Sequence, residues 1–144
     1  MDPLGPFLRL LEHNPLVFVH LLLALAALAL GAVILARRKG TGSHRAMGWL
    51  WVLLMGGTML TSAFLRDDDI PNLAGITPIH AFTVLVAVQL PRAVLAARRG
   101  DIARHRKDMR GMYIGGCLVA GLFALLPGRF LGHQLWSALG LLLA

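Results

Sequence analysis

The stretch Pro15–Ala36 reads PLVFVHLLLALAALALGAVILA and contains no charged residue in 22 positions. At 1.5 Å of rise per residue, a helix of this length measures about 33 Å, and the hydrocarbon core of a bilayer is roughly 30 Å thick. Asn14 followed by Pro15 indicates the start of the helix, because proline is favoured at the first helical position. This stretch therefore predicts a membrane-spanning helix.

The composition of the whole chain agrees with a membrane environment. The chain has 144 residues, of which 57% are hydrophobic, and its mean hydropathy is +0.70, well above that of a soluble domain of this size. The net charge of +7 would suggest nucleic acid as the partner of a soluble protein. Here the charges lie between apolar runs, which favours the lipid bilayer as the partner and excludes nucleic acid.

Three more apolar runs predict further spans. They cover residues 46–65 with Ser43 as a possible cap, residues 78–97 after Thr77-Pro78, and residues 103–126 between the cap Asp101 and the stop Pro127-Gly128. Gln89, Pro91 and Arg92 interrupt the third span, where Pro91 frees a backbone carbonyl and Arg92 can extend to the interface.

The remaining tail, residues 129–144, is apolar but too short to cross a bilayer comfortably, so we expect an interfacial helix there. The predicted fold class is an all-α integral membrane protein. Its single transmembrane domain, residues 1–144, is a four-helix up-down bundle with a short apolar C-terminal helix.

Two basic corners separate these runs: RRKGTGSHRAMGW at residues 37–49 and RRGDIARHRKDMR at residues 98–110. Short connections make consecutive helices antiparallel, so both corners lie on one side, which holds eleven of the fourteen Lys and Arg residues. Cytoplasmic loops carry the excess of Lys and Arg. We therefore expect a multi-pass protein of the bacterial inner membrane with both corners in the cytoplasm and both termini outside. Anionic lipid headgroups would suffice as partners of the arginines.

Four histidines occupy matching positions in the predicted helices. His20 and His80 lie near the outer ends of the first and third spans, and His44 and His105 near the inner ends of the second and fourth. In an up-down bundle these are two pairs on diagonal helices. About sixteen residues of helix separate the two levels on each side, which corresponds to roughly 24 Å.

Neutral imidazoles at these positions suit the axial ligands of one or two haem b groups, His20 with His80 and His44 with His105. Arg66 and Arg129 on the outer side and Arg45 on the inner side could pair with haem propionates. Iron with two axial histidines has no open position, so the expected chemistry is one-electron transfer by a membrane oxidoreductase or electron carrier. A quinol or a soluble reductant could meet the cationic face as donor.

Two other interpretations stay open. In a non-enzymatic accessory or structural membrane protein, His20 and His80 would hydrogen-bond each other or Thr61 and Ser62, and the tail around Trp136 would contact a protein partner. A Cu(I) site is the third possibility, because thioether and imidazole groups suit that ion. Its candidate ligands are spaced one helical turn apart in two places: Met55 with Met59, and His105 with Met109.

The two basic corners, together with His80, resemble a known family. His44-Arg45 followed by Gly48, the outer His80, and RRGDIARHRKDMR together resemble an uncharacterised family of small four-helix bacterial membrane proteins, over about residues 15–127. The resemblance to that family implies a four-helix membrane fold, and it implies no activity. Two histidine pairs on diagonal helices are also similar in architecture to two-haem b-type cytochromes, which include ascorbate-dependent and ferric-reductase-like transmembrane proteins; no sequence motif is shared with them.

Overall fold

The computed structural model of the protein describes residues 5–65 and 80–140, and this part of the chain is all helical. The elements are α1 (Gly5–His13), α2 (Pro15–Ala36), α3 (Gly42–Phe64), α4 (His80–Arg98), α5 (Ile102–Met112), the π-helical segment η1 (Tyr113–Val119), α6 (Ala120–Ala124) and α7 (Phe130–Ala138).

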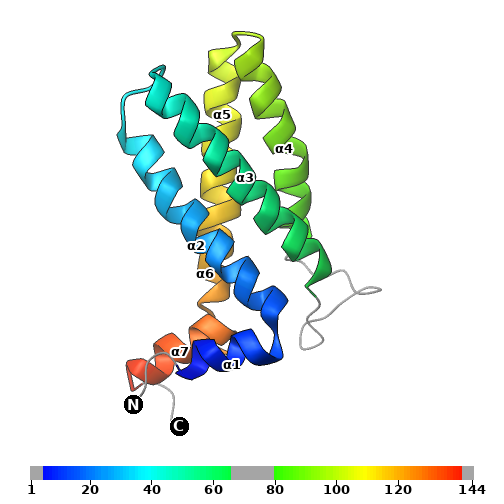
Figure 1. The fold of residues 1–144 in the computed structure, drawn as a ribbon, viewed down its shortest axis with the longest axis vertical. Coiled ribbons are helices and arrows are strands. Elements are labelled where there is room, and N and C mark those ends of the chain that lie inside the picture. The colour runs from blue at the N-terminus through cyan, green and yellow to red at the C-terminus, as the bar shows by residue number, and fades with distance from the viewer. Residues whose placement is uncertain (1–4, 66–79, 141–144) are drawn as a thin grey trace.

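The long helices α2, α3 and α4 lie side by side with the continuous helical path formed by α5, η1 and α6 (Figure 1). Contacts join α2 to α3, α3 to α4, and α4 to α5, while η1 touches both α2 and α4. Among the described residues, α2, α3 and α4 are the helices whose length and composition allow them to cross a membrane.

Helix α2 covers the same residues as the first predicted span and has Pro15 in its first turn. Helix α3 begins at Gly42, before the apolar run at 46–65, because its N-cap is Thr41 and not Ser43. The Thr41 hydroxyl oxygen accepts a hydrogen bond of 3.1 Å from the His44 amide, which stabilises one extra turn. The predicted start of the third span at Thr77-Pro78 lies outside the described residues, and α4 continues through Pro91 to Arg98.

The predicted span at residues 103–126 differs most from expectation. Asp101 caps α5 as predicted, accepting a hydrogen bond of 3.0 Å from the Arg104 amide. The path then changes from α-helix to π-helix at Tyr113 and back at Ala120, so it is not one regular α-helix. None of its three parts is among the candidate spans found in the described residues. The reason is length: the three parts have 11, 7 and 5 residues, and each is too short to cross a bilayer by itself.

Large side chains fill the space between the long helices. Trp51, Met55 and Met112 are fully buried, and the Trp51 indole donates a 2.9 Å hydrogen bond to the Ala27 carbonyl. A Cβ atom at Gly31 would lie 2.5 Å from the Tyr113 ring and 2.8 Å from the Trp51 indole nitrogen. The close approach of α2, α3 and η1 therefore requires glycine at this position.

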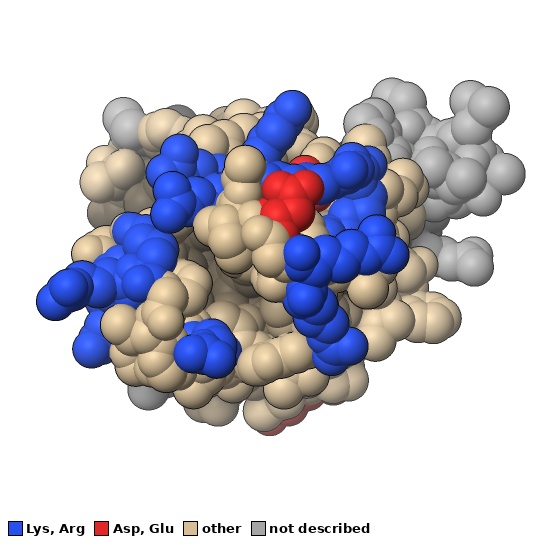
Figure 2. Space-filling model, turned by 90° about the horizontal axis from the view of Figure 1, so that it is seen from above, with Lys and Arg blue, Asp and Glu red and all other residues tan. Residues whose placement is uncertain are grey.

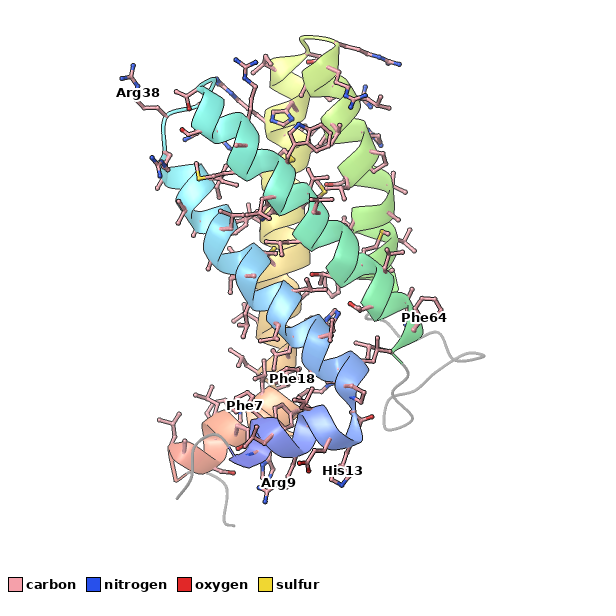
Figure 3. The ribbon with its side chains drawn as sticks, viewed as in Figure 1. Phe7, Arg9, His13, Phe18, Arg38 and Phe64 are labelled. Carbon is pink, nitrogen blue, oxygen red and sulfur yellow. The ribbon has the colours of Figure 1, made fainter. Side chains whose placement is uncertain are left out.

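The outward faces of the helices are apolar. Leu53, Phe64 and Leu122 are 69%, 71% and 66% exposed, and Figure 3 shows Phe64 directed away from the neighbouring helices. Exposed large hydrophobic residues occur on all the long helices. A surface of this kind is unfavourable in water and favourable against lipid chains.

Helices α1 and α7 lie next to each other at one end of the molecule, crosswise to the long helices (Figure 1). The rings of Phe7 and Phe130 meet edge to face with 5.7 Å between their centroids. The Trp136 indole donates a 2.8 Å hydrogen bond to the Leu125 carbonyl. The tail predicted at 129–144 thus contains a short helix whose tryptophan is bound within the chain; residues 141–144 lie outside the described part.

Candidate functional site

The two basic corners share one local design. Each turns at a glycine with positive φ, Gly40 at +83° and Gly100 at +78°, a conformation that side chains with a Cβ rarely adopt. The next residue, Thr41 or Asp101, caps the following helix. This repeat places His44 in the first turn of α3 and His105 just beyond the first turn of α5.

Basic side chains surround this end of the molecule, here called the basic end and formed by residues 37–45 and 98–110. Figure 2 views the molecule from this side and shows Lys and Arg around the rim with one acidic patch among them. Arg45 is exposed beside His44, and the Arg98 guanidinium lies 5.7 Å from the centre of the Trp49 ring. This cation–π contact connects α4 to α3.

At the basic end the structure brings His44 and His105 close enough to interact electrostatically. The His105 Nδ1 atom lies 3.0 Å from the Ala93 carbonyl oxygen of α4. A carbonyl can only accept, so Nδ1 carries the proton and the neutral ring keeps a lone pair on Nε2. The His44 Nδ1 atom is buried and has no hydrogen-bond partner within the described part of the chain.

At the opposite end, His20 is linked to α3. Its Nδ1 atom lies 2.9 Å from the Thr61 hydroxyl oxygen, and that hydroxyl is also 2.9 Å from the Gly57 carbonyl, to which it donates. The single hydroxyl proton is thereby used, so the oxygen accepts from His20 Nδ1. The Thr58 carbonyl also lies close to the ring, which likewise favours a protonated nitrogen facing α3. As for His105, the lone pair of the neutral ring is on Nε2.

A second polar bridge joins α3 to α4 beside the first. The hydroxyl oxygens of Ser62 and Thr83 are 2.8 Å apart, and Thr83 lies one turn after His80, the first residue of α4. Arg129 is the N-cap residue of α7 at this same end. Arg66, the other cation predicted to pair with a haem propionate, lies outside the described residues. The hydrogen bond between His20 and Thr61 confirms the interpretation in which Thr61 is a partner of His20.

Histidines with one nitrogen held by a protein oxygen are suited to bind a metal through the other. The hydrogen bond to the protein oxygen fixes the tautomer and the orientation of the imidazole ring. His20 and His105 have this arrangement, each with Nδ1 engaged, and each lies at a different end of the packed helices.

Of the methionines predicted to form a Cu(I) site, Met55 lies in the core, whereas Met59 and Met109 are partly buried and pack against it. The Cys117 thiol lies 3.6 Å from the Met55 sulfur, and Met55 is fully buried. Within the described ranges, no group of three His, Cys, Asp or Glu side chains is arranged to hold a metal ion.

Sequence reasoning missed a hollow between α4 and α5 at the basic end, whose wall includes Gln89 and Asp108. Asp108 is 8% exposed. The signal was visible in the sequence: Asp108 follows three basic residues in a strongly basic segment, and Gln89 is an amide in an apolar run. Their proximity was not visible, because it depends on how the two helices pack.

The long apolar helices, the lipid-like outer surface and the basic end define a helical membrane protein with three candidate spans among the described residues. Residues 17–136 match the family described as "Predicted membrane protein (DUF2306)", and the chain belongs to this family. The resemblance expected from the inner corners is thereby confirmed. No curated protein and no solved structure matches the chain.

Proposed function

We propose that this protein is a haem b electron-transfer protein of the bacterial inner membrane, with His44 and His105 as axial ligands at the basic end and His20 and His80 at the opposite end. The proposal includes a four-helix transmembrane bundle in which α5, η1 and α6 together form the fourth span. It is supported by the position of this path beside both α2 and α4.

The orientation in the membrane follows from the charges. The basic end would face the cytoplasm, because Lys and Arg are enriched in cytoplasmic loops. Helices α1 and α7, and with them both termini, would then lie on the outer side. Exposed apolar residues along the helices between these two ends support a bilayer at that level.

One observation carries the haem assignment: the pairing of His44 with His105. His44 on α3 and His105 on α5 both lie at the basic end, within range of an electrostatic interaction. His105 has Nδ1 bound to a carbonyl and Nε2 available, and His44 has a buried nitrogen without a partner in the described ranges. A buried, unpaired polar atom is costly, and a bound ligand would remove that cost.

The proposal of an outer haem site with His20 and His80 as ligands is supported mainly by His20. Its Nδ1 donates to Thr61, which leaves Nε2 for a ligand, and His80 lies on α4 at the same end. The layer of Trp51, Met55 and Met112 lies between the two ends, so two haem groups would occupy separate sites. Arg45 would serve the inner propionates, and Arg66 and Arg129 the outer ones.

A haem with two axial histidines supplies one-electron transfer, since it has no free coordination position. A quinol or a soluble reductant would approach the cationic basic end, and a further protein could dock at the outer end formed by α1 and α7. The protein would then act as a membrane oxidoreductase or as an electron carrier between two other components.

The test is the visible spectrum of protein purified in mild detergent from haem-replete cells. We expect the paired bands of reduced low-spin haem. His44→Ala and His105→Ala should remove the same part of the spectrum, and His20→Ala and His80→Ala the other part. His133→Ala is the matched control, because His133 is exposed on α7, and it should leave the spectrum intact. Colourless protein that is folded would overturn the proposal.

A second candidate function is favoured by the hydrogen bonds at the outer end. His20 to Thr61 and Ser62 to Thr83 join three neighbouring helices, as polar contacts do in membrane proteins without cofactors. An accessory or structural membrane protein would show these contacts and no visible absorption. Metal analysis of the same sample separates both candidates from a Cu(I) protein, which would be colourless and would contain copper.

A further inference from the structure

The hollow between α4 and α5 has a volume of about 630 Å³. Its wall is formed by Gln89, Arg92, Asp101, Ala103, Arg104, Lys107 and Asp108. A smaller hollow of about 170 Å³ shares Arg92, Asp101 and Arg104 with it and extends along Leu95 and Ala96. Cationic and apolar groups thus meet in one place at the level expected for lipid headgroups.

Two buried acceptor atoms belong to this wall. Gln89 Oε1 and Asp108 Oδ2 have no hydrogen-bond partner within the described residues. Asp108 forms an ion pair with Arg104, whose Nε lies 3.8 Å from Oδ2, beyond hydrogen-bonding distance. A buried carboxylate oxygen without a hydrogen bond is unfavourable, so this position suits a ligand that donates, and a positively charged donor most of all.

Glycine at position 111 leaves space for the side-chain amide of Gln89. A Cβ atom at Gly111 would lie 3.1 Å from Gln89 Oε1. The absence of a side chain on α5 therefore lets this oxygen lie between the two helices, close to the hollow.

The same wall offers cations for an anionic group. Arg92, Arg104 and Lys107 line it, and guanidinium and ammonium groups are the usual partners of phosphate oxygens. The Asp101 carboxylate is already used as the cap of α5. The hollow therefore combines acceptors for a cationic donor with cations for a phosphate.

We propose that this hollow binds a phosphate joined by a short link to a primary ammonium, as in the headgroup of phosphatidylethanolamine. The phosphate pairs with Arg92, Arg104 and Lys107, and the ammonium donates to Asp108 and Gln89. The lipid chains leave along the apolar part of the smaller hollow. This site is separate from the histidines and does not depend on bound haem.

The test is native mass spectrometry of the full-length protein in detergent, titrated with defined lipids. Phosphatidylethanolamine should bind at least about tenfold more tightly than phosphatidylcholine, whose quaternary ammonium has the same charge and no N–H donor. Asp108→Asn should remove most of this preference, and Lys107→Gln should weaken both lipids, because it acts on the phosphate.

Arg38→Gln is the matched control for charge. Arg38 lies in the other basic corner and points away from the helices (Figure 3), so this variant should bind phosphatidylethanolamine as the wild type does. The thermal unfolding midpoint of each variant confirms that it is folded. Exposed Lys107 provides a variant that is expected to fold even if Asp108→Asn does not.

Equal binding of the two lipids would overturn the proposal, as would an equal loss in Arg38→Gln and Lys107→Gln. Soluble phosphoethanolamine, added as a competitor, identifies the source of the group. If it displaces the lipid only at concentrations far above those of the lipid, the ligand is the phospholipid. If it binds as tightly as the lipid, the site belongs to a soluble molecule with the same headgroup.

Discussion

His20 and His44, at opposite ends of the molecule, differ in their hydrogen bonding. At the end near α1 and α7, His20 donates to Thr61, whose own proton is bound to Gly57. At the basic end, His44 Nδ1 is buried without a partner. In the described part of the chain, the other buried side-chain atoms without partners, Gln89 Oε1 and Asp108 Oδ2, line the hollow at this end.

This difference indicates that buried polar atoms at the basic end are available to a ligand. Native proteins satisfy nearly all buried polar atoms, and those left unsatisfied need an explanation such as a ligand. Among the described residues, the outer end has no buried side-chain atom without a partner, whereas the basic end has three. We infer that ligands complete the basic end.

The largest effect on stability is expected at the layer that separates the two ends. In Gly31→Ala the new methyl group would collide with Tyr113 and with the Trp51 indole, so the free energy of unfolding should fall by about 1–3 kcal/mol. Unfolding by SDS titration from mild detergent measures this. Gly56→Ala is the control, since a Cβ there meets no atom within 4 Å; equal losses in both variants would contradict the assigned packing.

The second prediction compares histidines from the two ends in protein without a ligand. His20→Leu should lower the free energy of unfolding by about 1 kcal/mol, because it removes a hydrogen bond to Thr61. His44→Leu should leave it unchanged or raise it, because the buried Nδ1 has no partner to lose in the described part of the chain. The same unfolding measurement applies, and a larger loss for His44→Leu would reverse the comparison.

The third prediction concerns Thr61→Val, which keeps the side-chain shape and removes the acceptor of the His20 proton. The free energy of unfolding should fall by about 0.5–1.5 kcal/mol. If His20 binds haem, loss of this orienting contact should also weaken retention of the outer haem by about 10–100-fold. Haem release to apomyoglobin measures the latter, and Thr58→Val, which removes a hydroxyl that donates to the Leu54 carbonyl of its own helix, is the control.

Much of this organisation could be predicted from apolar runs and capping residues. Helix α2 matches its predicted bounds, and Asp101 caps α5 as expected, because these features depend on neighbouring residues. The fourth span stays a prediction: residues 102–124 form one helical path, but its middle part, Tyr113–Val119, is a π-helix that the sequence analysis did not predict. Ser43 was mistaken for the cap because the apolar run begins later than the helix.

The sequence by itself determined the membrane class, the three long helices and the gathering of the basic residues at one end, since length, hydropathy and charge act locally or along a single helix. Only the tertiary structure decided which polar atoms are satisfied. The donors and acceptors involved come from different helices: Thr61 meets His20, Ala93 meets His105, and Gln89 and Asp108 share one hollow. Hydrogen bonds between helices depend on how those helices rotate and cross, which apolar periodicity does not specify.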